Sequence, residues 1–360
     1  MARQVGWDFK GIKGAALLRR RRFIASTLIT CVAGAFLGGV FHTIFLAKGR
    51  VEQMRHHAGY DAQSKSEVTK HIQAAGEFTN EATRLSMKDN VSVYNVAAAQ
   101  GLLTDKVWER LAKKVNVPAG NFIMGASATK NPMSDIQDRP QHTVYVKAFR
   151  IDKFPVTNAQ YALFIAEVAH RAPSSWVSGA IPVGYRVHPV TNVYWQDAMD
   201  YCTWAGGTLP TEAQWEKAAR GTDGRRWPWG NRMSPTMLNT YNTVGSTSSV
   251  FAHTKNASPY GAVDMAGNVA EWTRNDFKPY PGSTAPTSMF IAKARKGVGI
   301  VEHYKAIRGG SWMSDPFSTA TYHRNYAHRG DATNFIGFRC VYPAKNTNAN
   351  SREIAHAQTH

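Results

Sequence analysis

The sequence predicts an α+β domain with an irregular, loop-rich structure, preceded by one transmembrane helix and a helical stalk. Three observations lead to this prediction: an uncharged apolar run near the N-terminus, a glycine-poor region of helical periodicity, and a long remainder rich in glycine, proline and tryptophan. The 360 residues are 43% hydrophobic and include ten tryptophans, which is enough for one large packed domain with appended segments. This composition excludes a disordered chain.

The apolar run covers residues 23–47 and contains no formally charged side chain. As a helix it would reach about 37 Å, enough to cross a hydrocarbon core of about 30 Å. Arginines 19–22 directly precede it, so the positive-inside rule places residues 1–22 in the cytoplasm. We therefore expect a signal anchor in the inner membrane and a periplasmic or other extracytoplasmic main domain. A cleaved secretory signal and a twin-arginine export signal are the alternatives.

Two further features bear on the surroundings of the chain. Gly34 and Gly38 form a GxxxG pattern within the apolar run, which could pack against a partner helix in the lipid bilayer. The formal net charge of +18 would suit nucleic acid, an anionic membrane or an acidic protein surface. Seven of the basic residues precede the apolar run, and the remainder form no dense stripe. The sequence therefore favours acidic protein partners and disfavours nucleic acid.

Residues 48–114 have the texture of a helical stalk between the anchor and the main domain. The segment contains few glycines, and Ser64–Glu67 (SKSE) has the form of a capping box ahead of apolar residues at helical spacing. A second helix is expected at Asp105–Lys114. The polar residues 344–360 at the other end of the chain are expected to form a flexible tail.

Residues 115–343 form the predicted main domain, where short strand-like runs alternate with turn signals. Residues 142–152 alternate as one strand would. Thr211, followed three residues later by Gln214, is a capping signal for a helix. Amphipathic helices are expected at Asn158–Ala169, Trp195–Ala205 and Thr211–Arg220.

Three cysteines bear on the redox environment and on metal binding. Cys31 lies in the apolar run, and Cys202 and Cys340 are the only two in the exported region. Two cysteines permit a disulfide in an oxidising compartment, but their spacing alone does not establish one. The sequence has no CxxC or HExxH motif, so zinc sites of these types are not expected.

The main domain contains six motifs in this order: VPAGNFIMG (117–125), RPQHTVYVKAFRIDKFPVTNAQYALF (139–164), HPVTNVYWQDAMDYCTWAGGTLPTEAQWEKAARG (188–221), PYGAVDMAGNVAEWT (259–273), RGGSW (308–312) and IGFRC (336–340). Together they resemble the formylglycine-generating enzyme family, also called sulfatase-modifying factors. The resemblance implies one compact domain related to the C-type lectin fold, with little regular secondary structure.

The resemblance also implies a structural calcium ion and a disulfide. The calcium would be held by the side chains of Asp264 and Glu271 and by the carbonyls of Gly267 and Val269, a mixture of oxygen ligands that calcium accepts. The alternative is that Glu271 pairs with an arginine and Asp264 caps a turn. The disulfide would join the cysteines that the family pairs, which correspond to Cys202 and Cys340.

The family's oxidases hold copper through two reactive cysteines, and the corresponding positions here are Ser314 and Thr319. A hydroxyl is a poor ligand for Cu(I) and cannot form a mixed disulfide with a substrate cysteine. We therefore expect a degenerate active site, no copper, and no catalytic residues for this chemistry.

A serine-based triad of Ser314, Asp315 and His323 is also weighed, but neighbours in sequence give no reason to expect the relay geometry, so turn and cap roles are favoured. Four arginines are interpreted as structural residues that tie loops together: Arg308, Arg324, Arg329 and Arg339.

The leading hypothesis from the sequence is a non-catalytic protein. It would be a membrane-anchored accessory or structural subunit of a periplasmic or membrane respiratory complex, with redox enzyme subunits as partners. One alternative is an enzyme of the family, resembling the formylglycine-generating oxidases but using non-standard residues. The other is a lectin-like module that binds glycans or other small ligands, for which fold analogy is the main support.

Overall fold

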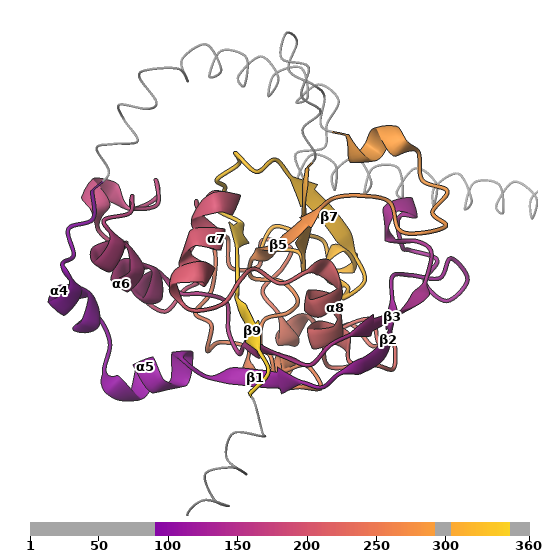
Figure 1. Cartoon of the computed structure of the whole chain (residues 1–360), viewed down its shortest axis with the longest axis horizontal. Helices are drawn as coiled ribbons and strands as arrows, with labels where there is room; N and C mark the ends of the chain where they lie inside the picture. Colours follow the sequence, from indigo (N-terminus) through magenta and orange to yellow (C-terminus); the bar gives the residue numbers. More distant parts are fainter. Residues whose placement is uncertain (1–90, 292–303, 346–360) are drawn as a thin grey trace, which may run out of the picture. The chain divides into compact units, whose positions relative to one another are not determined.

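The structure, a computed structural model, describes residues 91–291 and 304–345 (Figure 1). The predicted cytoplasmic segment, the membrane anchor with Gly34 and Gly38, and most of the predicted stalk and tail lie outside these residues. Within the described ranges, no helix combines the length and the apolar character needed to cross a membrane. The α+β, loop-rich prediction is confirmed, because short helices and short strands are joined by long loops throughout.

Local capping signals place the longer helices where the sequence predicts them. Thr157 and Thr211 each accept a hydrogen bond from the backbone N–H three residues later, while Gln160 and Gln214 accept one in return from the backbone of the capping residue. The α-helices of the described chain are α4 (Val96–Gln100), α5 (Asp105–Leu111), α6 (Asn158–Val168), α7 (Trp195–Trp204) and α8 (Glu212–Arg220).

The strands form three small sheets. One sheet has the order β1 (Lys114–Val117), β4 (Phe149–Asp152), β9 (Val341–Pro343) and is antiparallel. The second is the antiparallel pair β2 (Gly120–Met124) and β3 (His142–Val146). The third has the order β7 (Arg324–Ala327), β6 (Lys305–Arg308), β5 (Ala270–Asp276), β8 (Ile336–Gly337), in which β5 and β8 run parallel.

The prediction of one strand over residues 142–152 is wrong. The chain leaves its pairing with β2 at Val146 and enters a different sheet at Phe149, between β1 and β9. Alternation along the sequence cannot reveal this change, because both halves have strand periodicity and only the partner strands differ. Each partner is set by contacts distant in sequence.

The region interpreted as a stalk contributes to the packed domain at its C-terminal end. Ala99 lies in α4 and Leu102 follows this helix. Both are buried in the same hydrophobic cluster as residues of α6. Leu111 of α5 is buried with Phe154 and Val263 in a second cluster. The sequence predicts that the main domain starts at residue 115. The packed domain begins before that residue.

Aromatic side chains and a disulfide hold the core around α6 and α7, which lie side by side in Figure 1. Tyr161 of α6 stacks on Tyr201 of α7 with 5.9 Å between ring centroids, and Phe338 contacts both rings edge-on. Cys202 in α7 is bonded to Cys340, as the family resemblance implies. This bond ties α7 to the chain segment that enters β9.

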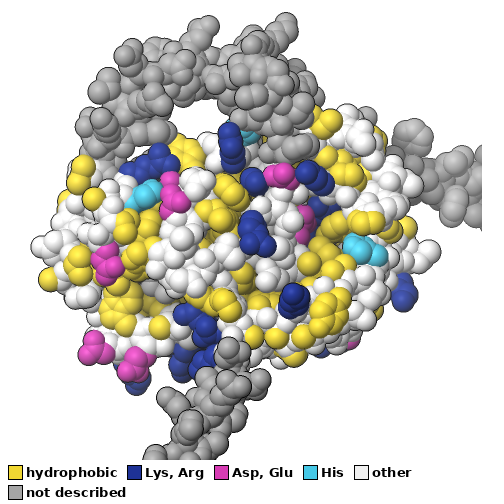
Figure 2. All heavy atoms as spheres, in the orientation of Figure 1, with side chains coloured by type: hydrophobic (Ala, Val, Ile, Leu, Met, Phe, Trp, Pro, Cys, Tyr) yellow, Lys and Arg dark blue, Asp and Glu magenta, His cyan; other side chains and the backbone are white. Residues whose placement is uncertain are grey.

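Figure 2 shows one face of the molecule, on which hydrophobic side chains cover wide areas. Lys and Arg side chains lie in separate groups between these areas and form no continuous stripe on this face. The expected acidic protein partner and the expected lack of nucleic-acid binding remain predictions.

Candidate functional site

A buried network of arginines and glutamates holds both ends of residues 308–324. These residues, which we call the reaction segment, contain the two positions that correspond to the family's reactive cysteines. Arg308, which opens the RGGSW motif, pairs with Glu212 at 3.0 Å and with Glu216 of the same helix, α8. Arg324 pairs with Glu212 at 2.7 Å. Burial alone would raise the pKa of Glu212, but the two guanidinium groups outweigh it and lower the pKa. The structural role predicted for Arg308 and Arg324 is confirmed.

The two positions that correspond to the family's reactive cysteines have ordinary structural contacts. Ser314 is half-buried, and its Oγ accepts the backbone N–H of Ser311 at 2.9 Å. Thr319 is fully buried, donates to the carbonyl of Pro316 at 2.7 Å and accepts from the indole of Trp227 at 3.2 Å. Neither position offers a thiolate, so a cysteine-held copper site cannot form here.

The residues of the serine-based triad do not come together as a relay. The Asp315 carboxylate accepts the backbone N–H groups of Phe317 and Ser318, which is a turn role. The His323 ring contacts Asp138, at 3.2 Å, and not Ser314. The turn and cap roles favoured by the sequence are the ones that the structure shows for Ser314 and Asp315.

Glu271, one of the two side-chain ligands expected for calcium, is already paired with a permanent cation. Its carboxylate accepts two hydrogen bonds of 2.7 Å from the guanidinium of Arg339 and one of 2.7 Å from the indole of Trp215. The glutamate and the arginine are both fully buried. The positive charge beside Glu271 therefore comes from Arg339, which confirms the structural role predicted for this arginine.

Asp264, the second side-chain ligand expected for calcium, also has partners within the protein. The carboxylate oxygens of Asp264 accept the side-chain amides of Asn256 and Asn268, at 3.0 and 3.1 Å. Gly267 has a left-handed φ of 75° and donates its N–H to a backbone carbonyl, while Val269 is buried. In this arrangement the residues do not fit a calcium ion, because the guanidinium of Arg339 already neutralises Glu271 and both oxygens of Asp264 accept side-chain amides. The contacts match the alternative, an arginine pair and a turn.

A pocket of about 180 Å³ lies beside the reaction segment. Trp312 of the RGGSW motif forms part of its wall, and its indole donates to the carbonyl of Asn334 at 3.2 Å. No lining residue carries a charge, and rings, amides and hydroxyls dominate the lining. The lining residues are Asn158, Ser175, Trp176, Pro182, Tyr185, Pro189, Thr191, Asn192, Gly245, Ser246, Thr247, Trp312 and Asn334.

Strained backbone and one histidine adjoin this pocket. Asn192 in the lining, and Tyr241 and Asn242 in the loop before Gly245, have left-handed φ values of 59°, 54° and 56°. Non-glycine residues adopt this conformation at a cost, and such strain is frequent at functional sites. His188 contacts the Thr247 hydroxyl at 3.1 Å, and burial lowers the pKa of its imidazole. A neutral imidazole next to the pocket is able to accept a proton.

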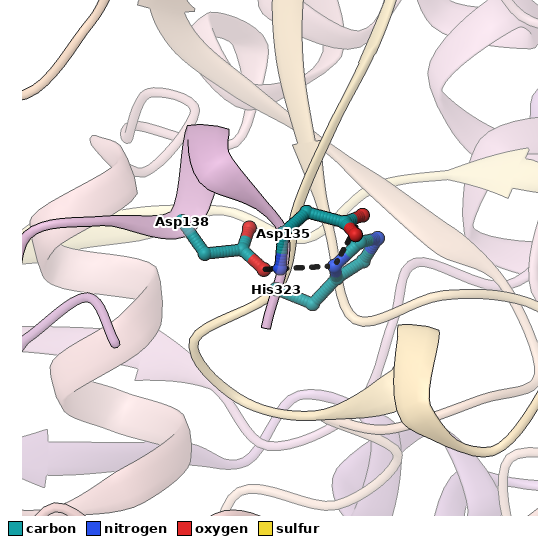
Figure 3. A group of neighbouring side chains, drawn as sticks. All are labelled: Asp135, Asp138 and His323. Atoms are coloured by element: carbon teal, nitrogen blue, oxygen red, sulfur yellow. Dashed lines mark hydrogen bonds and ion pairs between the residues drawn. The ribbon is translucent and has the colours of Figure 1, made fainter. Parts of the chain in front are cut away.

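A group of three polar side chains, Asp135, Asp138 and His323, was not predicted from the sequence (Figure 3). Asp135 and Asp138 lie at the two ends of one 3₁₀ turn (Ile136–Asp138 with its cap), and His323 lies opposite them. Burial alone would lower the pKa of His323, but the negative charges of Asp138, Asp135 and Asp315 outweigh it and raise the pKa. The spacing of Asp135 and Asp138 in a capping-box pattern was the one local signal available.

Comparisons with known proteins agree with the motifs. A family model described as "Sulfatase-modifying factor enzyme 1-like domain" matches residues 99–344. A hercynine oxygenase of Mycolicibacterium smegmatis is 32% identical over 264 residues, which cover 63% of this chain and 60% of the relative. A formylglycine-generating enzyme of Mycobacterium tuberculosis is 30% identical and covers 64% of this chain and 98% of the relative. This chain thus spans only about 60% of the hercynine oxygenase.

The solved structure of PvdO from Pseudomonas aeruginosa has a TM-score of 0.52 and 25% sequence identity, over 64% of this chain and 94% of that chain. It supports the mixed α+β fold expected from the resemblance. The sequence relatives overturn the expectation that the chain is not an enzyme, because both carry the names of enzymes. Neither is named as a subunit of a respiratory complex. The family model covers well over half of the chain, and the chain therefore belongs to the family of sulfatase-modifying factor enzyme 1-like domains.

Proposed function

We propose that this chain is an enzyme of the family that binds its substrate in the Trp312 pocket and oxidises it with molecular oxygen as the electron acceptor, without a cysteine pair. The observation that carries the proposal is the position of Trp312, which belongs both to the RGGSW motif and to the pocket wall. The names of the relatives, an oxygenase and a formylglycine-generating enzyme, support an oxidation as the reaction class.

The lining indicates what kind of substrate group the pocket would hold. The rings of Trp176, Tyr185 and Trp312 offer flat apolar surface, and the amides and hydroxyls between them offer hydrogen-bond donors and acceptors. Because no lining residue is charged, burying a charged group there would leave it without a partner. The group that enters is therefore uncharged and planar, with its own donors or acceptors.

His188 is the proton acceptor that we propose for this site. Its imidazole contacts the hydroxyl of Thr247, which lines the pocket, and its ring lies 4.4 Å from that of Tyr185. The lowered pKa keeps the ring neutral at pH 7, so it can take a proton from a bound group through the Thr247 hydroxyl.

We also propose that the enzyme works outside the cytoplasm. The Cys202–Cys340 disulfide supports this location, because disulfides persist in oxidising compartments and are rare in the cytosol. The predicted signal anchor points to the same side of the membrane. The expected association with a membrane or periplasmic protein complex remains a prediction.

The test measures oxygen uptake and product mass with three probes: a cysteine-containing peptide, hercynine with a thiol, and a neutral tyrosine-containing peptide. We expect turnover of the neutral aromatic probe. Asn192→Asp, which places a charge at a half-buried position of the lining, should raise KM about tenfold or more by leaving a charge without a partner. Asn121→Asp makes the same change at an exposed position and should leave KM unchanged. Turnover that Asn192→Asp does not affect would place the substrate elsewhere, and a lack of oxidation of all three probes would count against the proposed enzyme activity.

A further inference from the structure

We propose that Asp135, Asp138 and His323 form a binding site for a divalent transition-metal ion of the manganese, iron or zinc class. Each residue offers one ligand atom, and the three atoms lie within 4.8 Å of one another (Figure 3). The Nδ1 of His323 is 3.2 Å from an oxygen of Asp138 and 4.0 Å from an oxygen of Asp135. Ligands bound at about 2.1 Å to one ion lie about 3 to 4 Å apart, so small side-chain movements complete the geometry.

The donor set selects the class of ion. One imidazole and two carboxylates suit manganese, iron and zinc, whereas Cu(I) prefers thiolates and calcium prefers an all-oxygen cage. Three protein ligands leave further coordination positions for water or another molecule. The side chain of Asp135 is 58% exposed while that of Asp138 is fully buried, so the group is open to solvent on one side.

The charge balance of the group also favours a cation. Among the described residues, no Lys or Arg side chain forms an ion pair with Asp135 or Asp138. Asp138 accepts the backbone N–H groups of Asp135 and Arg324, but the guanidinium of Arg324 is committed to Glu212. A fully buried carboxylate beside a second carboxylate therefore has only the His323 ring to supply positive charge.

A second His–Asp–Asp group in the same chain provides a contrast. The Nε2 of His170 lies 3.7 Å from Asp197 and 3.8 Å from Asp200. There, however, Arg171 donates to Asp197 at 2.6 Å, so a permanent cation already occupies the position beside the carboxylates. The His323 group differs in this respect, which makes the His170 group a matched control.

The backbone presents the ligands in advance of any ion. Asp135 caps the 3₁₀ turn that Asp138 ends, and the side chain of Asp138 accepts the N–H of Asp135 at 3.0 Å. His323 immediately precedes Arg324, the first residue of β7, whose N–H donates to Asp138 at 2.8 Å. These contacts hold Asp138 in place, and fixed ligands bind metal more tightly than mobile ones. The proposal does not depend on the function proposed for the Trp312 pocket.

The experiment uses the full-length chain, freed of metal with a chelator and titrated separately with Mn²⁺ and Zn²⁺. Bound metal per chain is measured by mass spectrometry of the elements, and affinity by calorimetry. We expect His323→Gln to lose one bound ion per chain relative to the unaltered protein. Asp135→Asn, a mild change at an exposed side chain, should weaken binding of that ion about tenfold or more.

His170→Gln and Asp200→Asn are the matched controls and should leave the stoichiometry and affinity unchanged. The proposal is overturned if Asp135→Asn binds as tightly as the unaltered chain, or if the controls lose the same ion. It is also overturned if neither metal binds in a stoichiometric amount that His323→Gln reduces. Circular dichroism of each variant separates loss of the site from loss of the fold.

Discussion

Thr319 occupies one of the two positions at which the family's oxidases carry a reactive cysteine, and its hydroxyl is used twice in the structure. It donates to the carbonyl of Pro316 and accepts from the indole of Trp227, while the side chain is fully buried. A side chain with both hydrogen-bonding roles filled is not available to attack a substrate. Its contribution is to stability, and that contribution can be measured.

Thr319→Val keeps the shape of the side chain and removes the hydroxyl. We expect unfolding to become easier by about 1 to 3 kcal/mol, because the buried indole N–H of Trp227 loses its acceptor. Urea denaturation provides the measurement. The same change at the exposed Thr236 should cost under about 0.5 kcal/mol. Equal losses at both positions would contradict the role given to Thr319.

Asp152 provides a prediction about pH. Burial raises its pKa from 3.8 to about 6, against opposing contributions from the Cys340 N–H and from Lys114. The folded state therefore holds a proton that the unfolded chain releases between about pH 4 and 6. Stability from this group is present at low pH and is lost as the pH rises through that window, by about 3 kcal/mol at most.

Asp152→Asn removes the titrating group while keeping an acceptor for the Cys340 N–H. We expect the variant to gain stability relative to the unaltered chain as the pH rises from 4 to 6, in a series of urea titrations. Asp105→Asn, at an exposed position, should show no such trend. A stability difference that stays constant across the window would show that Asp152 does not have the raised pKa.

At the scale of elements, the sequence predicts helices better than strands. The helices α6 and α8 are each capped by a Thr that precedes the first helical residue and is followed three residues later by a Gln, a signal contained within four residues. The sequence predicts β3 and β4 as a single strand, because the change of sheet between them depends on β2, β1 and β9. The starts of these helices can thus be predicted from neighbouring residues, whereas the bounds of the strands depend on partner strands that are distant in sequence.

The disulfide between α7 and the segment entering β9 carries a prediction at the same scale. It closes a loop with a sequence separation of 138 residues, which stabilises the folded chain by up to about 4 to 5 kcal/mol in the chain-entropy model. Reduction should lower the urea midpoint of the protein substantially. The double variant Cys202→Ala, Cys340→Ala should start from the lower midpoint and not respond to the reductant. A midpoint unchanged by reduction would contradict this contribution.

At the scale of the whole molecule, neither candidate site could be predicted from the sequence, because each is assembled from segments that are distant along the chain. His323 and Asp138 are 185 residues apart and meet only when β7 lies beside the 3₁₀ turn. The pocket draws its lining from segments between residues 158 and 334. The reaction segment itself was recognised from the RGGSW motif, but the motif does not reveal which loops close around Trp312.

The membrane anchor is a prediction for the whole chain, since residues 23–47 lie outside the described ranges. We expect the full-length protein to stay in the membrane fraction after washing at alkaline pH and to be digested by protease added from the outer side. A variant with three charged residues placed within 23–47 should leave the membrane fraction, because each charge at a helix centre costs about 3 kcal/mol. Retention of that variant would argue against a spanning helix.

The attachment of Trp312 has a consequence for how this protein could change during evolution. Its backbone is bonded to Asn268 and Asn242, and its indole to Asn334, so this part of the pocket wall is tied to three separate segments. Much of the remaining wall comes from the loops around residues 175–192 and 245–247. Insertions or exchanges in those loops would reshape substrate preference while leaving the anchored tryptophan in place, which makes them the natural positions for loop grafting between relatives.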